Sequence, residues 1–162
     1  MITIMRIDDR LLHGQVAQSW ASCYHLDRIY IINDEVMNDE FSKVTLRLAK
    51  PRQVEVLFSE VQSAGRILSE ELASDRRVMV IVENFQDAKQ VYGYIPQIRR
   101  INIGGQRKRP DQNTMKVNNY VVLSRRDVEI CRYLNSRGVK LEIRQIPAEK
   151  ELVLDVNRKE EP

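Results

Sequence analysis

Cysteine and histidine are scarce in this sequence, with two residues of each among 162. Cys23 and Cys131 lie far apart, in helix-like patterns, and lack the spacing of metal ligands. This argues against a disulfide framework and against a zinc site, and it favours a reducing cytosol. Histidine chemistry, if there is any, must come from His13 or His25.

Long hydrophobic runs are also missing. No apolar run approaches the roughly eighteen residues that a membrane-spanning helix needs. The N-terminus lacks the basic region, apolar core and small-residue cleavage site of a signal peptide. We therefore expect a soluble protein whose work at a membrane would need a partner. The formal net charge of +3, with 30% charged residues, neither demands nor excludes nucleic acid.

What the sequence does contain is an alternation of short β-branched runs with helical periodicities, which is typical of βαβ crossovers around a parallel sheet. With 43% hydrophobic residues, the chain can form one domain with a proper core, over residues 1–162. We predict a three-layer α/β/α fold with an open, mainly parallel sheet of about six or seven strands. The predicted strands cover residues 2–8, 28–33, 53–58, 78–82, 100–104, 117–123 and 139–146.

Apolar periodicity places helices between these strands. In the first helix, Trp20 belongs to the apolar stripe, so we expect it in the core. Spacing of i, i+3, i+4 and i+7 marks the next helix at Phe41, Val44, Thr45 and Leu48. Ser59 with Gln62 predicts a capping box before a third helix, and Asn84 and Ser124 are predicted N-caps of later helices.

The stretch that carries chemistry is residues 6–16, Arg-Ile-Asp-Asp-Arg-Leu-Leu-His-Gly-Gln-Val, at the end of the first strand and the start of the first helix. His13 follows Arg10 by three residues and comes after Asp8 and Asp9. A neutral imidazole is a good nucleophile, a guanidinium matches phosphoryl oxygens, and a helix N-terminus offers free amides to an anion. This combination suits phosphoryl chemistry.

Other polar residues follow strand ends and should lie at the same edge of the sheet, because ligands of open α/β sheets bind beyond the carboxyl ends of the strands. We expect the following residues at this edge: Asp8, Asp9, Arg10, His13, Asn33, Asp34, Glu83, Asn84, Gly104 and Gly105.

Each of these residues also has a plainer interpretation. A single histidine is usually a surface or core residue, and Arg10 could form only a surface ion pair with Asp8 or Asp9. The two aspartates could be loop formers that accept backbone hydrogen bonds; alternatively, one of them orients Arg10 or the imidazole. His25 has no accompanying motif, and we assign it no function.

Residues 99–109 contain five basic side chains and no acidic one, around the pair Gly104-Gly105. Besides a solvated surface, three functions compete for Arg107, Lys108 and Arg109: attraction of phosphate, docking to an acidic partner, and nucleic-acid binding. The last is the weakest, because no RNA-binding motif or aromatic pair accompanies them. Of the three, we predict docking to an acidic partner surface, with no part in the chemistry. The glycine pair is not a P-loop, since the Gly-Lys-Ser/Thr ending is missing.

From residues 6–16 outward, the chain resembles the IIB components of the mannose/fructose/sorbose family of the sugar phosphotransferase system (PTS). The resemblance continues through residues 33–39, 101–105, 138–140 and 146–147, and so covers essentially the whole chain. Two departures are Gln106, where the family usually has methionine, and the Lys-Pro-Arg turn at 50–52 in place of a proline-and-glycine turn.

The resemblance implies a fold with strand order 3-2-4-1-5-6-7 and an active-site loop after strand 1. It implies that His13, through its delta nitrogen, accepts phosphate from a IIA phosphohistidine and passes it to a sugar that enters through the membrane components IIC and IID. Arg10 would clamp the phosphate, while Gly14, Gln15, Asn33 and Asp34, with the glycine pair and the basic segment, would bind phosphate or partners.

No cofactor or metal ion is implied, and the protein would be cytoplasmic, held at the inner face of the membrane through IIC and IID. Neither the sugar nor the presence of a homo-oligomer can be deduced from the sequence.

Two other classes of protein compete with this interpretation. A histidine phosphatase or mutase also forms a phosphohistidine on an α/β sheet, but its Arg-His-Gly signature is absent, and His25 is poorly placed as the second acid. The third class is a regulatory or nucleic-acid-binding α/β module without catalysis.

Overall fold

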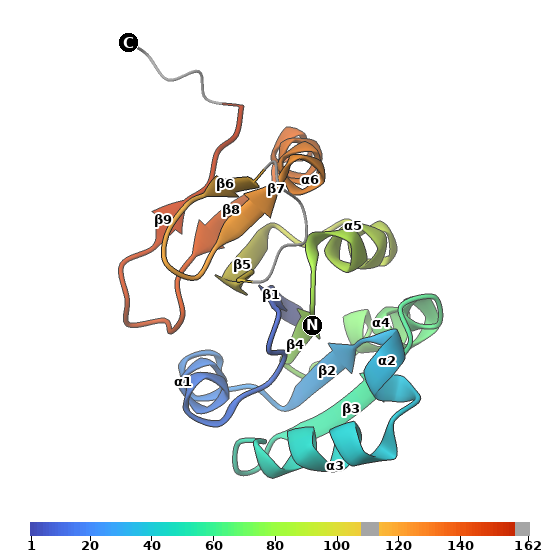
Figure 1. Ribbon diagram of the computed structural model, residues 1–162. Coiled ribbons are helices and arrows are strands. Elements are labelled where there is room, and N and C mark those ends of the chain that lie inside the picture. Colours follow the sequence, from blue (N-terminus) through green and yellow to red (C-terminus); the bar gives the residue numbers. More distant parts are fainter. Residues whose placement is uncertain (108–113, 158–162) are drawn as a thin grey trace.

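A computed structural model describes residues 1–107 and 114–157 of the chain. Its centre is a seven-stranded sheet of order β3-β2-β4-β1-β5-β8-β9 (Figure 1). All neighbouring strands are parallel except the last pair, in which β9 is antiparallel to β8. The strands are β1 (Ile2–Asp8), β2 (Arg28–Ile32), β3 (Glu55–Ser59), β4 (Val78–Val82), β5 (Arg100–Gly105), β8 (Lys140–Ile143) and β9 (Leu152–Val153).

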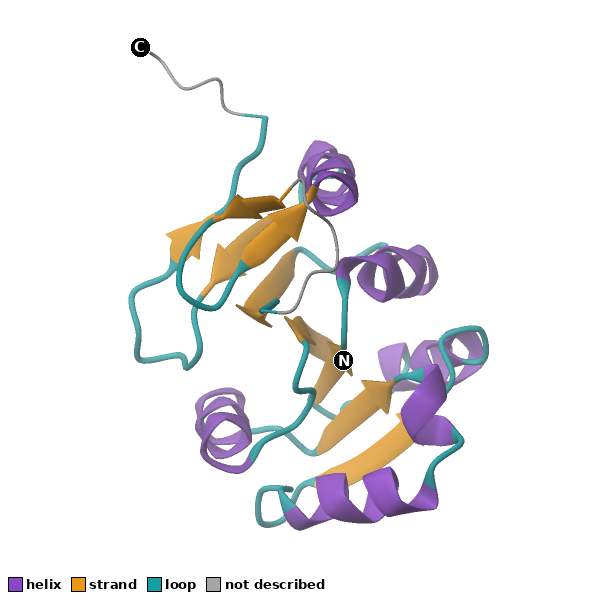
Figure 2. Ribbon diagram, viewed as in Figure 1, coloured by secondary structure: helices purple, strands orange, loops and turns teal. Residues whose placement is uncertain are grey.

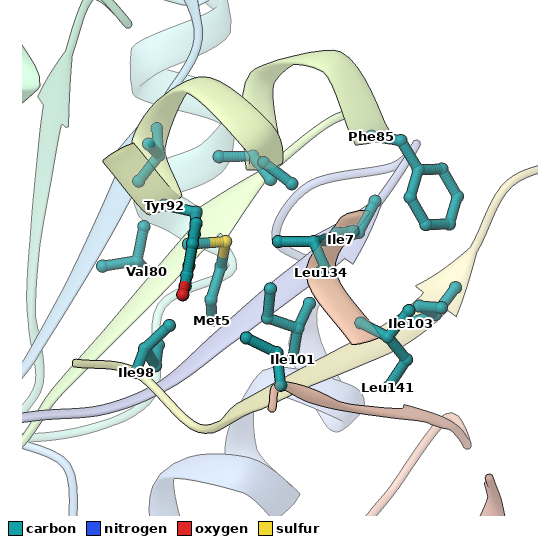
Figure 3. Close-up of a cluster of buried hydrophobic side chains, with 14 of the residues drawn as sticks. Met5, Ile7, Val80, Phe85, Tyr92, Ile98, Ile101, Ile103, Leu134 and Leu141 are labelled. Atoms are coloured by element: carbon teal, nitrogen blue, oxygen red, sulfur yellow. The ribbon is translucent and has the colours of Figure 1, made fainter. Parts of the chain in front are cut away.

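Helices cover both faces of this sheet (Figure 2). One buried cluster lies between the sheet and α4, α5 and α6, and part of it is shown in Figure 3. A second cluster lies under α1, with part of α3 packed against it. The helices are α1 (Gly14–Tyr24), α2 (Asp34–Met37), α3 (Glu40–Leu48), α4 (Ala64–Leu72), α5 (Phe85–Tyr94) and α6 (Arg125–Ser136). This is the predicted three-layer α/β/α fold.

The central strand β1 determines which side chains reach the site. Successive strand side chains point to opposite faces, so Met5 and Ile7 enter the α5 side of the core. Arg6 and Asp8 point to the α1 side, where the Arg6 guanidinium lies over the ring of Trp20, 5.5 Å from its centroid. Trp20 is fully buried, as predicted.

The predicted strand at 117–123 is wrong as a member of the main sheet. Instead, β6 (Thr114–Lys116) and β7 (Val122–Ser124) form a separate antiparallel pair. The Asn118 Oδ1 accepts hydrogen bonds from the Tyr120 and Val121 amides, which bends the chain in the middle of the predicted run. The run's hydrophobicity serves packing, because Val121 and Leu123 are fully buried. The sixth and seventh places in the sheet belong to β8 and β9.

Two of the three predicted helix caps are present in the structure. Ser124 and Asp127 form a capping box, and Asn84 caps α5 by accepting from the Asp87 amide. The predicted capping box at Ser59 is wrong, because Ser59 ends β3 and its hydroxyl donates to the Glu60 carbonyl. The helix α4 begins five residues later.

At the amino-terminal edge of the sheet, Glu71 is a buried carboxylate with four side-chain donors. Its oxygens accept hydrogen bonds from Arg28, Tyr30, Ser74 and Arg76 at 2.6–3.1 Å. Burial alone would raise the pKa of Glu71, but these hydrogen bonds outweigh it and lower that pKa to about 2. This edge is opposite the predicted site, so the network stabilises the fold without taking part in the chemistry.

Candidate functional site

The predicted site is a loop between β1 and α1. The Leu11 amide donates to the Asp8 carbonyl at 2.9 Å, and Leu11 adopts a positive φ of 57°. Leu11 and Leu12 are buried in the α1-side cluster, so they anchor the loop on the sheet. His13 then stands at the N-cap position of α1 without capping it through its side chain. The amides of the first turn therefore remain without a bond from this side chain.

Asp8 lies at the centre of the site, and its carboxylate is fully buried. Its Oδ2 lies 2.9 Å from Arg6 Nη2 and 3.7 Å from His13 Nε2. Its Oδ1 accepts from the Arg10 amide at 3.0 Å and lies 3.5 Å from Arg10 Nε and 3.6 Å from Arg107 Nη1. Asp8 thus makes both the backbone contact of a loop former and side-chain contacts that can orient Arg10 and the imidazole.

His13 presents a partly exposed imidazole, with 31% of its side chain accessible. Its Nε2 is buried, faces Asp8 and makes no hydrogen bond among the described residues. Nδ1, unlike Nε2, is not among the buried nitrogens that lack a hydrogen-bond partner. Burial, and after it the positive charge of Arg10, lowers the pKa of His13 below 6.5, so the imidazole is neutral at pH 7.

Arg6 is a buried cation that the sequence reasoning missed. Its guanidinium hydrogen-bonds Asp8 and the side chain of Asn102 on β5, and it stacks against Trp20. A Cβ at Gly104 would overlap this guanidinium, so that glycine makes room for Arg6. The strand alternation gave a signal, because Arg6 and Asp8 share one face of β1, but Asn102 lies 96 residues away along the chain.

Arg10 lies at the surface of the site, with 42% of its side chain accessible. Besides Asp8, it contacts Gln145, whose Oε1 accepts from Arg10 Nη2 at 3.1 Å. The Gln145 carbonyl accepts from Trp20 Nε1 at 2.8 Å, which ties the loop after β8 to α1. Gln145 was not predicted, because only the fold brings this loop to Arg10.

Arg107 is part of the charge network and is not a free charge on the rim. Its backbone amide and its Nη1 donate to the two oxygens of Asp9, each at 2.6 Å. A Cβ at Gly105 would overlap the Arg107 guanidinium. Lys108 and Arg109, also predicted in this segment, lie outside the described residues. Among the described residues, three guanidiniums (Arg6, Arg10 and Arg107) and two carboxylates (Asp8 and Asp9) form a charge network beside His13, with an excess of positive charge.

Asn33 and Asp34 lie at the carboxyl end of β2, which β4 separates from β1. Asn33 is buried, caps α2 and donates to Glu83 Oε2 at 2.8 Å, while Asp34 accepts from the Val61 amide. The hydrogen bonds of both residues lie within this neighbouring group, which is separate from His13. They lie at the predicted edge of the sheet, beside the charge network.

Gly14 and Gln15 form the first turn of α1, beside His13. A Cβ at Gly14 would meet nothing within 4 Å, so the backbone there is open to an approaching group. Gln106, the departure from the family's methionine, is buried, and its Nε2 donates to the carbonyls of Glu83 and Gly105. It links the ends of β4 and β5 beneath the site.

His25 is the C-cap of α1, at the opposite end of this helix from His13. A helix of eleven residues is about 16 Å long, so His25 cannot protonate a group leaving His13. Within residues 1–107 and 114–157, no cluster of three or more His, Cys, Asp or Glu side chains is arranged to hold a metal ion. No helix in those ranges is long and apolar enough to cross a membrane.

The chain is a three-layer α/β domain with a histidine among arginines at the carboxyl edge of a parallel sheet. The sequence matches the family "PTS system sorbose subfamily IIB component" over residues 2–160. It is 34% identical to the sorbose-specific EIIB component of Klebsiella pneumoniae over 148 residues, which are 91% of this chain and 89% of that protein. The chain belongs to this family of PTS IIB components.

Solved structures of related proteins have the same fold. The crystal structure of the IIBSor domain of the Klebsiella pneumoniae sorbose permease superposes with a TM-score of 0.85 at 33% identity, over 94% of this chain and 92% of that one. The crystal structure of manxB from Thermoanaerobacter tengcongensis gives the same TM-score at 30% identity, with the same coverage of both chains. The mannose-specific EIIAB component of Escherichia coli K12 is 33% identical over 152 residues, and the chain spans about half (46%) of its length.

Proposed function

We propose that this protein relays a phosphoryl group through His13, from a phosphohistidine on a IIA protein to a sugar that enters through the membrane components IIC and IID. The observation that carries the proposal is the partly exposed, neutral imidazole of His13, whose Nε2 faces Asp8 and around which Arg6, Arg10 and Arg107 gather. Membership of the PTS IIB family supports the same function.

In the first transfer, His13 Nδ1 forms a bond to phosphorus while the bond from phosphorus to the donor's imidazole nitrogen breaks. Nδ1 is the available nitrogen because Nε2 is buried against Asp8. That carboxylate also stabilises the positive charge that the ring gains on attack, and it holds the ring's orientation. Phosphorylation at Nδ1 therefore leaves the contact with Asp8 in place.

The transition state of phosphoryl transfer is loose, and its charge is spread over the phosphoryl oxygens. Arg10, at the surface beside His13, is the guanidinium best placed to bind these oxygens, and the first-turn amides of α1 at Gly14 and Gln15 can add hydrogen bonds. The transfers need no cofactor and no metal ion, because positioned positive charge supplies the stabilisation.

In the second transfer, a sugar hydroxyl oxygen bonds to phosphorus while the bond to Nδ1 breaks, and the proton that the hydroxyl loses balances the one that the released imidazole needs to return to its neutral form. Both transfers need a surface site that two partners can reach in turn, and the exposure of His13 and Arg10 meets this requirement. The protein would then work in the cytoplasm, at the inner face of the membrane where IIC and IID present the sugar.

The test is labelling of the purified protein by a phosphorylated IIA protein of the sorbose or mannose type. We expect His13→Ala to abolish labelling and the matched control, His25→Ala, to leave it unchanged. The label should be acid-labile and stable to alkali, as a phosphoramidate is, whereas an acyl phosphate on Asp8 or Asp9 would be lost in alkali. Full labelling of the His13→Ala protein, or hydrolysis of generic phosphate esters without a partner, would contradict the proposal.

A further inference from the structure

The helix α3 carries an apolar stripe that faces away from the core. Phe41 is 80% exposed, Val44 53% and Leu48 83%. Their spacing is that of an amphipathic helix facing a core. Figure 1 shows α3 at the margin of the molecule beside β3, the edge strand of the sheet. A contiguous apolar stripe at such a place marks an interaction surface.

The stripe is held rigidly. The Asp39 carboxylate caps α3 by accepting from the amides of Phe41 and Ser42. On the opposite face, Lys43 is buried and Leu46 packs against the α1-side cluster. The helix therefore cannot rotate to bury Phe41 without exposing Leu46, and the stripe is a permanent feature of the surface.

A negatively charged residue flanks one end of this stripe, and a positively charged residue flanks the other end. In heptad notation, Phe41 and Leu48 take position a and Val44 takes position d, while Glu40 and Arg47 take position g. Glu40 and Arg47 thus lie on the same flank of the stripe, with the acidic residue at the amino end and the basic residue at the carboxyl end. A surface with this arrangement is complementary to itself when it is turned end for end.

We propose that α3 pairs antiparallel with α3 of a second copy of this chain, about a two-fold axis at Val44. In this arrangement Val44 meets the partner's Val44, Phe41 meets the partner's Leu48, and Glu40 meets the partner's Arg47. The last two contacts occur twice, as they must in an isologous dimer. A parallel pair would place position g against position e, which is Thr45, so Glu40 and Arg47 would keep only their contacts within one chain, with Lys43 and with the Phe58 ring.

The dimer leaves the site at His13 open. Strands β2 and β4 separate β1 from β3, beside which α3 lies, so both histidines of the dimer can meet their partners. The contact is small, because a nine-residue helix is only about 14 Å long. Stable dimers bury about 800 Å² per partner, so we expect a reversible dimer with a Kd on the order of 10–100 μM.

Sedimentation of the whole protein from about 5 to 500 μM measures this equilibrium. We expect the weight-average mass to rise from monomer to dimer across this range. Phe41→Ser with Leu48→Ser should give a folded monomer throughout, because both side chains are exposed and the circular dichroism spectrum should not change. The matched control, Met115→Ser, removes an apolar side chain that is 46% exposed elsewhere and should leave the dimer intact.

Charge reversal tests the antiparallel geometry separately. Glu40→Lys alone and Arg47→Glu alone each create two like-charge contacts and should weaken the dimer about 10-fold or more. Mixing the two variants restores both opposite-charge contacts, so the mixture should dimerise with the wild-type affinity.

A wild-type protein that stays monomeric at 500 μM would refute the dimer. A mixture of the two charge variants no tighter than either variant alone would refute the antiparallel pairing. A monomeric wild type together with loss of sugar uptake in the serine double variant would assign the stripe to another protein, and would also overturn the proposal. The mass measurements do not depend on phosphorylation of His13, so the proposed function stands or falls by its own test.

Discussion

Arg10 should matter far more for phosphoryl transfer than for folding. Its side chain is 42% exposed, and its folded-state contacts are the one with Asp8 Oδ1 at 3.5 Å and the hydrogen bond to Gln145 at 3.1 Å. Exposed contacts of this kind contribute about 0–1 kcal/mol to the free energy of unfolding. Asp8 keeps its buried partner Arg6 when Arg10 is removed. Arg10→Ala should therefore lower the free energy of unfolding by less than about 1 kcal/mol.

The effect on the transition state should be larger. Loss of one donor to a developing oxyanion costs about 2–4 kcal/mol, and the exposure of Arg10 to water places it at the lower end of that range. We therefore expect Arg10→Ala to slow transfer about 30-fold. Arg10→Lys should recover only part of this rate, because a single ammonium cannot reproduce the bidentate geometry of a guanidinium.

The assay is single-turnover transfer from phosphorylated IIA protein to this protein, at saturating concentration, together with urea unfolding of each variant. Arg66→Ala is the matched control, since Arg66 is an exposed arginine whose side chain is paired with Glu70 on α4. A wild-type transfer rate in Arg10→Ala would reduce Arg10 to a surface ion pair. A loss of several kcal/mol in stability would show that the rate effect comes from a damaged fold.

Four further predictions follow from the same contacts. Asp8→Ala should destabilise the protein by about 3–5 kcal/mol in urea unfolding, because it leaves the buried Arg6 charge without its carboxylate. A loss below about 1 kcal/mol would show that Arg6 does not depend on Asp8. The rate of phosphoryl acceptance should fall in acid with a midpoint below pH 6.5, since the pKa of His13 is lowered and the neutral imidazole is the nucleophile; a midpoint above 6.5 in the pH profile would be the opposite result. Glu71→Gln should cost about 3 kcal/mol at pH 7, because the pKa of Glu71 falls from 4.5 to about 2 on folding. This contribution is present above pH 4.5 and is lost as the pH falls toward 2, so denaturation curves of variant and wild type should converge there. Arg107→Gln should slow transfer at saturation as well as association, because Arg107 is held by Asp9 and its positive charge acts on His13. An effect on association alone would instead support the docking function.

Local sequence was enough to predict the strands around the centre of the sheet and the loop that carries His13. The β-branched runs of β1, β2 and β4 are bounded by polar residues, and parallel strands bring those residues to one edge. The motif from Asp8 to His13 could be interpreted from chemistry alone, because nucleophile, guanidinium and helix start are neighbours in the chain.

The rest of the site depends on contacts between distant parts of the chain. Asn102 and Gln145 reach Arg6 and Arg10 only through the order of β1, β5 and β8. The predicted strand at 117–123 failed because one side chain, Asn118, holds a turn within an apolar run.

The helix α3 shows a second limit of sequence patterns. The spacing of Phe41, Val44 and Leu48 predicted a helix, and α3 forms there. Periodicity alone does not say whether such a stripe faces the protein's own core or another molecule. Here Leu46 occupies the core-facing side and leaves the stripe exposed.

Phosphorus–nitrogen NMR of the phosphorylated protein tests most directly whether one nitrogen of one residue carries the phosphoryl group. The protein would carry ¹⁵N in its histidine rings and would be phosphorylated by a IIA protein of the sorbose or mannose type. We predict a single phosphohistidine, with the phosphorus coupled to Nδ1 of His13 and with Nε2 still facing Asp8. Coupling to Nε2 of His13, or to either nitrogen of His25, would contradict the account.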